Sequence, residues 1–197
     1  MAKINRVEKC RKEQRCSKCG KTIPVGSPYL YAEPRYRGKI VRCTSCGLQY
    51  WETSGSEFVL TCGAIQNNWR EDYGMSQDAL ESLKGDLEEL RDTCQDSFDN
   101  MPESLQYGPT GEMLQERVDM LDGVIDALDC VTEYDDVKEE IEYDVFEDYK
   151  SDNELDEELE IEDLTEEQSA ELEELVESKV NDQFGESVDE ALSDLEY

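Results

Sequence analysis

Histidine is absent from this 197-residue sequence. Catalytic schemes that need an imidazole are therefore excluded, among them Ser-His-Asp triads, Cys-His pairs and histidine-ligated catalytic zinc. No GxGxxG or Walker A pattern occurs, so dinucleotide and P-loop phosphate sites are not indicated either. Carboxylates are abundant, but the sequence marks none of them with an apolar pocket or a charged partner. These absences favour a binding or regulatory protein over an enzyme.

Long apolar runs are also missing. No stretch approaches the 18 or so consecutive apolar residues of a membrane-spanning helix. The basic start, Met1–Lys12, lacks the apolar segment of a secretory signal. We therefore expect a cytoplasmic protein without membrane contact. In that reducing setting, closely paired cysteines bind metal more often than they form disulfides.

The charge is distributed very unevenly. Residues 1–50 contain six lysines and six arginines against three glutamates, a net charge of +9, whereas the whole chain has a net charge of −32. The remaining residues, 51–197, therefore have a net charge of −41. A basic head attached to an acidic body predicts that the two parts have partners of opposite charge.

Two CxxCG motifs are the most specific feature of the sequence. Cys16 and Cys19 form the first pair and Cys43 and Cys46 the second, with 23 residues between the pairs. Two intervening residues let both sulfurs of a pair reach one ion, and the glycine that follows suits the tight turn. Four thiolates complete a tetrahedral site for a structural Zn²⁺ ion. A redox CxxC pair or an iron–sulfur cluster fits this spacing less well.

The other four cysteines lack a partner at CxxC distance. We interpret Cys10 and Cys62, which flank the paired motifs, as packed thiols. Cys94 and Cys130 lie on or beside apolar helical stripes, and a small buried hydrophobic role is expected for both.

The segment between the motifs predicts a β-hairpin. Residues 29–31 and 39–42 have the composition of short strands, and residues 34–38 contain the Pro and Gly of a turn. A short helix is expected over residues 48–51. The order of knuckle, hairpin, knuckle and helix is that of a treble-clef or zinc-ribbon module.

The stretch from residue 15 to residue 27, RCSKCGKTIPVGS, resembles the start of a PARP-type zinc finger. That family shares a CxxC knuckle followed by Ile and Gly before a strand, and its fingers bind DNA ends and nicks. The resemblance implies that Cys16, Cys19, Cys43 and Cys46 are the four ligands. The sequence departs from the family at the third ligand, which is Cys43 here and histidine there. In overall style the chain also resembles small acidic bacteriophage proteins, which would place it in a host cytoplasm.

Basic and aromatic residues are interleaved around the predicted turn. Lys and Arg can neutralise phosphates, and Tyr can stack on unpaired bases. The candidate nucleic-acid contacts are Arg35, Tyr36, Arg37, Lys39 and Arg42. The alternative is that the tyrosines cover a small core and the arginines solvate its rim.

Two amphipathic stripes follow the basic head. Ser76 is a suitable N-cap for a helix whose apolar positions run from Leu80 to Phe98, and Asn100-Met101-Pro102 should end it. A second stripe runs from Leu114 to Val131. The two predict an antiparallel helical hairpin, in which the stripes face each other or those of a second copy in a homo-oligomer.

The last third of the chain is acidic. Residues 133–163 contain 17 Asp and Glu against two lysines and are expected to be a linker, either solvated and disordered or able to imitate the phosphates of DNA. Thr165 and Gln168 form a capping box for an amphipathic helix, and Gly185 should break it.

Together these features predict an α+β fold. We expect a zinc-finger module at residues 1–70, a helical hairpin at 71–132, an acidic linker at 133–163 and an amphipathic helix at 164–197. The expected function is non-catalytic binding of DNA or RNA by a zinc-finger regulatory protein. The alternative is an acidic, DNA-mimicking inhibitor or adaptor that binds a basic nucleic-acid-processing protein through residues 133–163.

Overall fold

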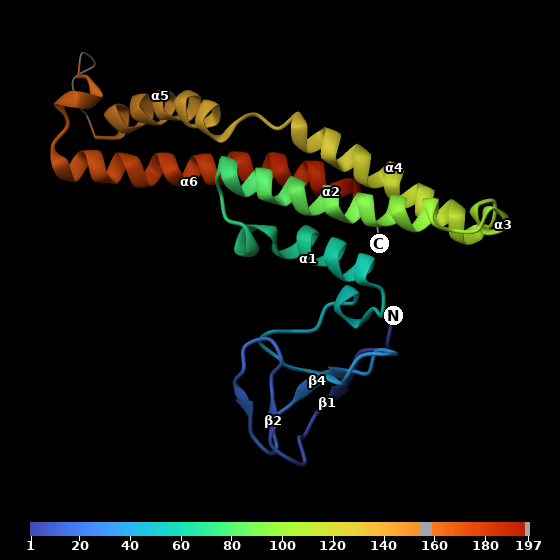
Figure 1. The fold of residues 1–197 in the computed structure, drawn as a ribbon. Coiled ribbons are helices and arrows are strands. Elements are labelled where there is room, and N and C mark those ends of the chain that lie inside the picture. Colours follow the sequence, from blue (N-terminus) through green and yellow to red (C-terminus); the bar gives the residue numbers. More distant parts are fainter. Residues whose placement is uncertain (154–158, 196–197) are drawn as a thin grey trace. The chain divides into compact units, whose positions relative to one another are not determined.

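The computed structural model describes residues 1–153 and 159–195 (Figure 1). The chain divides into two compact units, residues 1–67 and the part from residue 68 onward. All described strands belong to the first unit, and the second is helical. The predicted α+β fold is thereby confirmed.

A small antiparallel sheet forms the centre of the first unit. Its strand order is β1-β4-β5, with β1 at Asn5–Val7, β4 at Tyr29–Ala32 and β5 at Ile40–Cys43. A separate ribbon pairs β2 (Gln14–Arg15) with β3 (Thr22–Ile23). The predicted hairpin is confirmed by the pairing of β4 with β5, whereas strands as short as β1 and β2 carry too little periodicity to be recognised.

The β4–β5 turn holds an aromatic residue in an unusual conformation. Tyr36 is the one non-glycine residue with positive φ, at 68°, among the residues described. The Arg37 amide donates to the Pro34 carbonyl and closes the turn. The left-handed conformation costs a side chain such as tyrosine about 1–2 kcal/mol, yet 88% of Tyr36 is exposed, so packing does not repay this cost.

The segment after the second knuckle differs from the expectation. The helix predicted at residues 48–51 is displaced to a single 3₁₀ turn, η1 (Trp51–Thr53), and helix α1 (Glu57–Asp72), which the sequence analysis missed, follows it. Gly63 of α1 lies against the Trp51 ring, where an added Cβ would be only 2.4 Å from Cγ. Gly63 weakens the helical pattern in the sequence, but its lack of a side chain lets the Trp51 ring pack against the helix.

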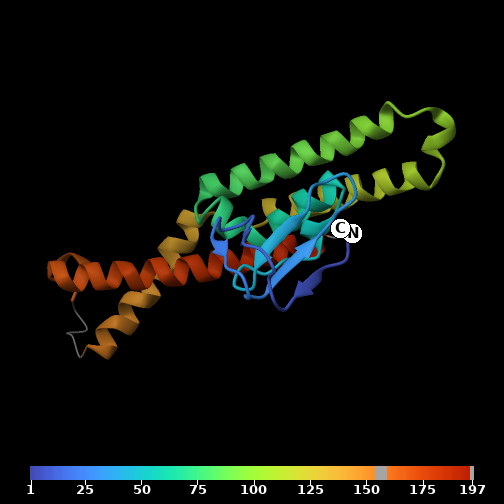
Figure 2. The same ribbon diagram turned by 90° about the horizontal axis from the view of Figure 1, so that it is seen from below.

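Helix α2 (Gln77–Asp99) and helix α4 (Pro109–Asp129) form the predicted hairpin within one chain (Figure 2). The Ser76 hydroxyl accepts from the Ala79 amide, as expected of the N-cap. The hairpin core is made of side chains with almost no exposed surface: Leu83, Leu87, Leu121, Val124 and Leu128.

The connection between these helices is more structured than expected. A short helix, α3 (Glu103–Gln106), occupies it, and α4 begins at Pro109 in its first turn. Gly111 is tightly enclosed, because an added Cβ would lie 2.0 Å from the Gln106 carbonyl oxygen. Pro109 therefore starts the helix, and Gly111 leaves room for the backbone of Gln106.

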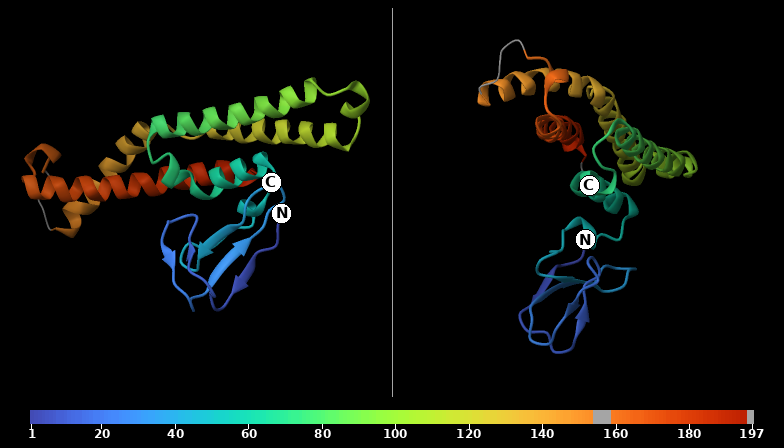
Figure 3. Two further views of the ribbon diagram at one scale, coloured as in Figure 1. Left: turned by 60° about the horizontal axis from the view of Figure 1, so that its bottom comes forward. Right: turned by 90° about the vertical axis from the view of Figure 1, so that its left-hand side faces the viewer.

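Much of the expected acidic linker is helical. Residues 134–152 form helix α5 (Tyr134–Asp152), which packs against helix α6 (Glu166–Ala191) and crosses it obliquely (Figures 1 and 3). Between them is an apolar cluster of Val137, Ile141, Val145, Phe146, Tyr149, Leu172, Val176 and Val180. The 3₁₀ turn η2 (Ile161–Asp163) precedes α6, and residues 154–158 of the expected linker lie outside the described part. The high carboxylate content hid this apolar stripe in the sequence.

Gly185 does not break the last helix. The predicted capping box of Thr165 and Gln168 is present, and α6 continues through Gly185 to Ala191 before the 3₁₀ turn η3 (Leu192–Asp194). An added Cβ at Gly185 would lie 2.8 Å from both Arg70 Cζ and Met75 Cε. Both atoms are the ends of flexible side chains, but Arg70 is held by Asp189, so an added methyl group would have to displace this ion pair.

Asp189, one turn after Gly185 on α6, holds Arg70 in place. Its Oδ1 accepts from Trp69 Nε1 at 2.7 Å and its Oδ2 from Arg70 Nη2 at 2.5 Å.

Within residues 1–153 and 159–195, no helix has the length and apolar character needed to cross a membrane.

Replacing Gly185 by alanine tests the packing role. Alanine improves helix propensity, but the contact with Arg70 should dominate and lower the free energy of unfolding by about 1–3 kcal/mol. Gly123→Ala on α4 is the matched control: nothing lies within 4 Å of its added Cβ, and stability should rise by about 0.5–1 kcal/mol. Urea unfolding followed by circular dichroism measures both. Equal stabilisation by the two substitutions would contradict the packing role.

Candidate metal centre

The two cysteine motifs fold into turns of the same kind. In the first, the Gly20 amide donates to the Cys16 carbonyl at 3.0 Å; in the second, the Gly47 amide donates to the Cys43 carbonyl at 3.2 Å. Both glycines have positive φ, 70° for Gly20 and 65° for Gly47. This backbone conformation explains why glycine follows each pair.

The turns bring four sulfurs together. The Sγ atoms of Cys16, Cys19, Cys43 and Cys46 all lie within 4.8 Å of one another, and those of Cys19 and Cys43 are 3.8 Å apart. Metal–sulfur bonds of about 2.3 Å in a tetrahedral site place neighbouring sulfurs about 3.8 Å apart. The cluster therefore has the dimensions needed to hold one metal ion.

Ser17 fastens the first turn to the sheet. Its hydroxyl donates to the Val41 carbonyl at 2.9 Å and accepts from the Val41 amide at 3.2 Å, and its own amide donates to the same carbonyl at 2.8 Å. Val41 lies in β5, two residues before Cys43. The first cysteine pair is thus held in register with β5, at whose end the second pair begins.

The protein environment distinguishes the four thiols. Burial of Cys16 opposes its ionisation, but backbone N–H groups of Cys19, Cys43 and Lys18 outweigh this and lower the pKa of its thiol to about 6. The Cys46 amide lowers the pKa of the Cys43 thiol in the same way. Hydrogen bonding with the Cys43 sulfur raises the pKa of Cys46 to about 12. Amide dipoles directed at sulfur stabilise thiolates, the form that binds metal.

The remaining cysteines lie outside this cluster. Cys10, Cys62 and Cys94 are buried, which agrees with packed thiols. Cys130, for which a buried role was expected, is exposed. It is the C-cap of α4, beyond Leu128, which is the last buried residue of the helix.

Three of the predicted nucleic-acid contacts lie on the outside of the β4–β5 turn. The guanidinium carbon of Arg35 is 5.0 Å from the centroid of the exposed Tyr36 ring. The Lys39 ammonium is 4.0 Å from the Tyr31 ring centroid and 3.5 Å from the Glu33 carboxylate. These side chains form a basic and aromatic surface that solvent reaches freely.

The other two predicted contacts are turned toward the module. Arg37 Nη1 donates to the carbonyls of Glu52 and Ser54, both at 3.2 Å. Arg42 Nη2 donates to Glu52 Oε1 at 2.5 Å, and only 13% of the Arg42 side chain is exposed. Sequence reasoning missed Glu52, because no local signal links its carboxylate to Arg42, 10 residues before it, or its carbonyl to Arg37, 15 residues before it.

The chain matches no known family, no curated protein and no solved structure. The likenesses to PARP-type fingers and to bacteriophage proteins therefore stay predictions from the sequence. What the geometry adds is a four-cysteine group that can hold a metal ion.

We expect one tetrahedral metal ion per chain, measurable by elemental analysis and by the absorption spectrum of a cobalt(II)-exchanged sample. Cys43→Ser should abolish the thiolate charge-transfer band at one equivalent, whereas Cys130→Ser should leave it intact. Metal binding displaces protons from the thiols, so affinity should fall as pH is lowered. An unchanged spectrum in Cys43→Ser would show that the four sulfurs do not act together.

Proposed function

We propose that this chain is a non-catalytic zinc-finger protein whose first unit binds DNA or RNA in a regulatory role. Zn²⁺ suits four thiolates in a tetrahedral arrangement. Four protein ligands leave no position for a substrate or water, so the ion would be structural.

The observation that carries the proposal is the exposed surface of the β4–β5 turn. Tyr36 is held in a costly backbone conformation with 88% of its surface in solvent. Neither feature helps the module fold, whereas both suit an aromatic ring that stacks on a base. Arg35 lies beside this ring and Lys39 three residues on, where they can neutralise phosphates.

The charge of the surrounding chain supports the same function. Residues 1–50 have a net charge of +9. Four thiolates with one Zn²⁺ would lower this value by two, so the module would stay basic with metal bound. A basic module attracts polyanions over several ångströms, independently of their sequence.

A second candidate function rests on the packing of helix α5 against helix α6. Their apolar residues pack together, so the carboxylates on their outer faces have fixed spacing. Such a surface can imitate the phosphates of DNA and bind the basic cleft of a nucleic-acid-processing protein as an inhibitor or adaptor. The exposed carboxylates of α5 are Asp135, Asp136, Glu139, Glu140, Asp144, Glu147, Asp148 and Asp152.

Fluorescence anisotropy with labelled single-stranded, nicked and duplex DNA, and with RNA, tests the leading function in the full chain. Tyr36→Ala and Arg35→Glu should each weaken binding at least tenfold. Added salt should weaken it further, because phosphate contacts release counterions.

Arg11→Glu is the control for charge alone, since this exposed arginine lies outside the turn. If it weakens binding as much as Arg35→Glu, the turn has no special role. Absence of binding to every nucleic acid would overturn the proposal and favour the acidic inhibitor or adaptor.

A further inference from the structure

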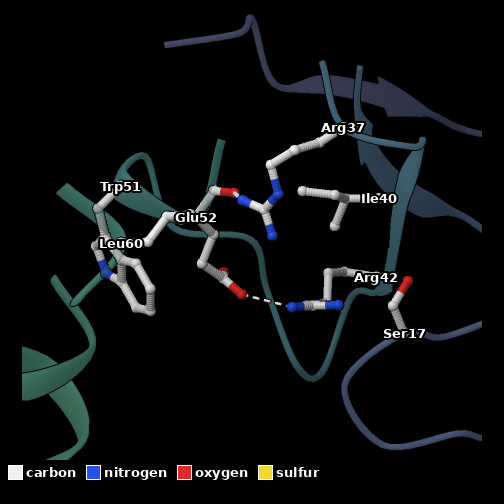
Figure 4. Close-up of a pocket in the computed structure, with 7 residues that line it drawn as sticks. All are labelled: Ser17, Arg37, Ile40, Arg42, Trp51, Glu52 and Leu60. Atoms are coloured by element: carbon white, nitrogen blue, oxygen red, sulfur yellow. Dashed lines mark hydrogen bonds and ion pairs between the residues drawn. The ribbon is translucent and has the colours of Figure 1, made fainter. Parts of the chain in front are cut away.

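A cavity of about 290 Å³ lies in the first unit beneath the β4–β5 turn (Figure 4). Its walls come from the first knuckle, from the turn and β5, from η1, and from α1. The lining residues are Ser17, Arg37, Ile40, Arg42, Trp51, Glu52 and Leu60. In Figure 4 the guanidinium groups of Arg37 and Arg42 both face the space in front of Glu52.

The side-chain acceptors of this wall are already used. Glu52 Oε1 accepts from Arg42, and Glu52 Oε2 accepts from the Gln49 amide at 2.8 Å. The Ser17 hydroxyl is occupied in both directions by Val41. A ligand that needs acceptors from these side chains would have to compete with the module's own hydrogen bonds.

Donors, in contrast, are in excess. Arg42 Nε is buried and has no hydrogen-bond acceptor in the described part of the chain. Trp51 Nε1 is also buried without an acceptor, but it lies on the side of the indole away from the arginines (Figure 4). Arg37 makes its two bonds through Nη1, so its Nη2 edge is left for another group. A buried donor without an acceptor costs about 1–3 kcal/mol, so the wall favours an occupant that brings acceptor oxygens.

The charge of the cavity also favours an occupant that brings oxygen acceptors. Two guanidinium groups face one carboxylate, which leaves a net charge of +1 in a partly enclosed space. Arginine recognises phosphate and carboxylate oxygens through paired N–H groups. The occupant should therefore carry an anionic group with several oxygens.

The opposite wall is apolar and limits the size. Leu60 and the Trp51 ring supply it, whereas Ile40 lies between the two arginines (Figure 4). The volume is just below the range of about 300–1,000 Å³ found for small-molecule pockets. A single nucleotide has this combination of a compact aromatic body and a phosphate, whereas a base pair is too large.

We propose that this cavity holds one unpaired nucleotide, with its phosphate against Arg37 and Arg42 and its base against Trp51 and Leu60. This inference rests on the proposed nucleic-acid function and assigns its substrate class, single-stranded rather than intact duplex nucleic acid. Tyr36 and Arg37 are consecutive residues of one turn, so a strand can stack one base on the exposed ring while its neighbour enters the cavity.

The test compares two exposed arginines of the same turn in the full, metal-loaded chain. Arg37 lines the cavity, whereas Arg35 lies beside the Tyr36 ring outside it. Titrations with adenosine 5′-monophosphate and with adenosine, followed by amide chemical shifts, should show binding of the nucleotide at least tenfold tighter than the nucleoside. Arg37→Gln should remove this difference, and Arg35→Gln should preserve it.

A second titration measures the preference for single-stranded over duplex DNA by anisotropy. We expect at least a tenfold preference that Arg37→Gln reduces and Arg35→Gln keeps, even where overall affinity falls. The cobalt(II) spectrum of each variant confirms that the module is folded.

The two proposals fail in different ways. If oligonucleotides bind through Tyr36 and Arg35 but the mononucleotide does not bind, the cavity assignment is overturned and the proposed function stands. If the mononucleotide binds but no oligonucleotide does, the occupant is not part of a strand and the proposed function is overturned. Equal effects of Arg35→Gln and Arg37→Gln also overturn the cavity assignment.

Discussion

The convergence of four sulfurs from two distant turns is the constraint on which the first unit depends. A unit of 67 residues has little interior, and around the knuckles the buried cluster is limited to Cys16, Ile23 and Val41. Small domains of this kind are usually stabilised by a metal or by disulfides. Because Ser17 joins the first knuckle to β5, the ligands, the sheet and the cavity wall form one continuous framework.

The second unit has to fold despite its high negative charge. Its carboxylates repel one another, and only helices that bury an apolar face can offset that repulsion. The pairs α2–α4 and α5–α6 do so with leucine, valine and isoleucine on facing stripes. Several of its few basic residues form ion pairs with acidic neighbours, as Arg91 does with Asp92 and Asp122. The acidic surface is therefore carried on packed helices.

Local signals in the sequence were sufficient for part of this structure. The CxxCG motifs, the Ser76 cap and the Thr165 capping box each depend on residues within four positions of one another, so the sequence alone identifies them. Helix α1, helix α5 and the continuation of α6 were missed, because their helical signal is hidden by a glycine or by many carboxylates. Gly63 and Gly185 look like helix breakers until the Trp51 ring and the Arg70 side chain are placed against them.

The candidate site, too, could be predicted from the sequence only in part. Spacing alone groups the four ligands, but it treats five basic and aromatic residues of the hairpin as equivalent. Tertiary contacts separate them: Arg35, Tyr36 and Lys39 face solvent, whereas Arg37 and Arg42 turn toward Glu52. That separation depends on groups distant in sequence, the Glu52 carboxylate for Arg42 and backbone carbonyls for Arg37, and no local pattern contains it.

The absence of imidazole from the ligand set also affects which metals the module would accept. Four thiolates form a soft donor set, and softer ions such as Cd²⁺ and Cu⁺ bind such donors at least as readily as Zn²⁺ does. Selection of the ion would then depend on metal supply in the surroundings more than on the protein. In a metal-stressed cell, the knuckles of Cys16 and Cys43 would exchange their ion while the backbone turns that hold them stay the same.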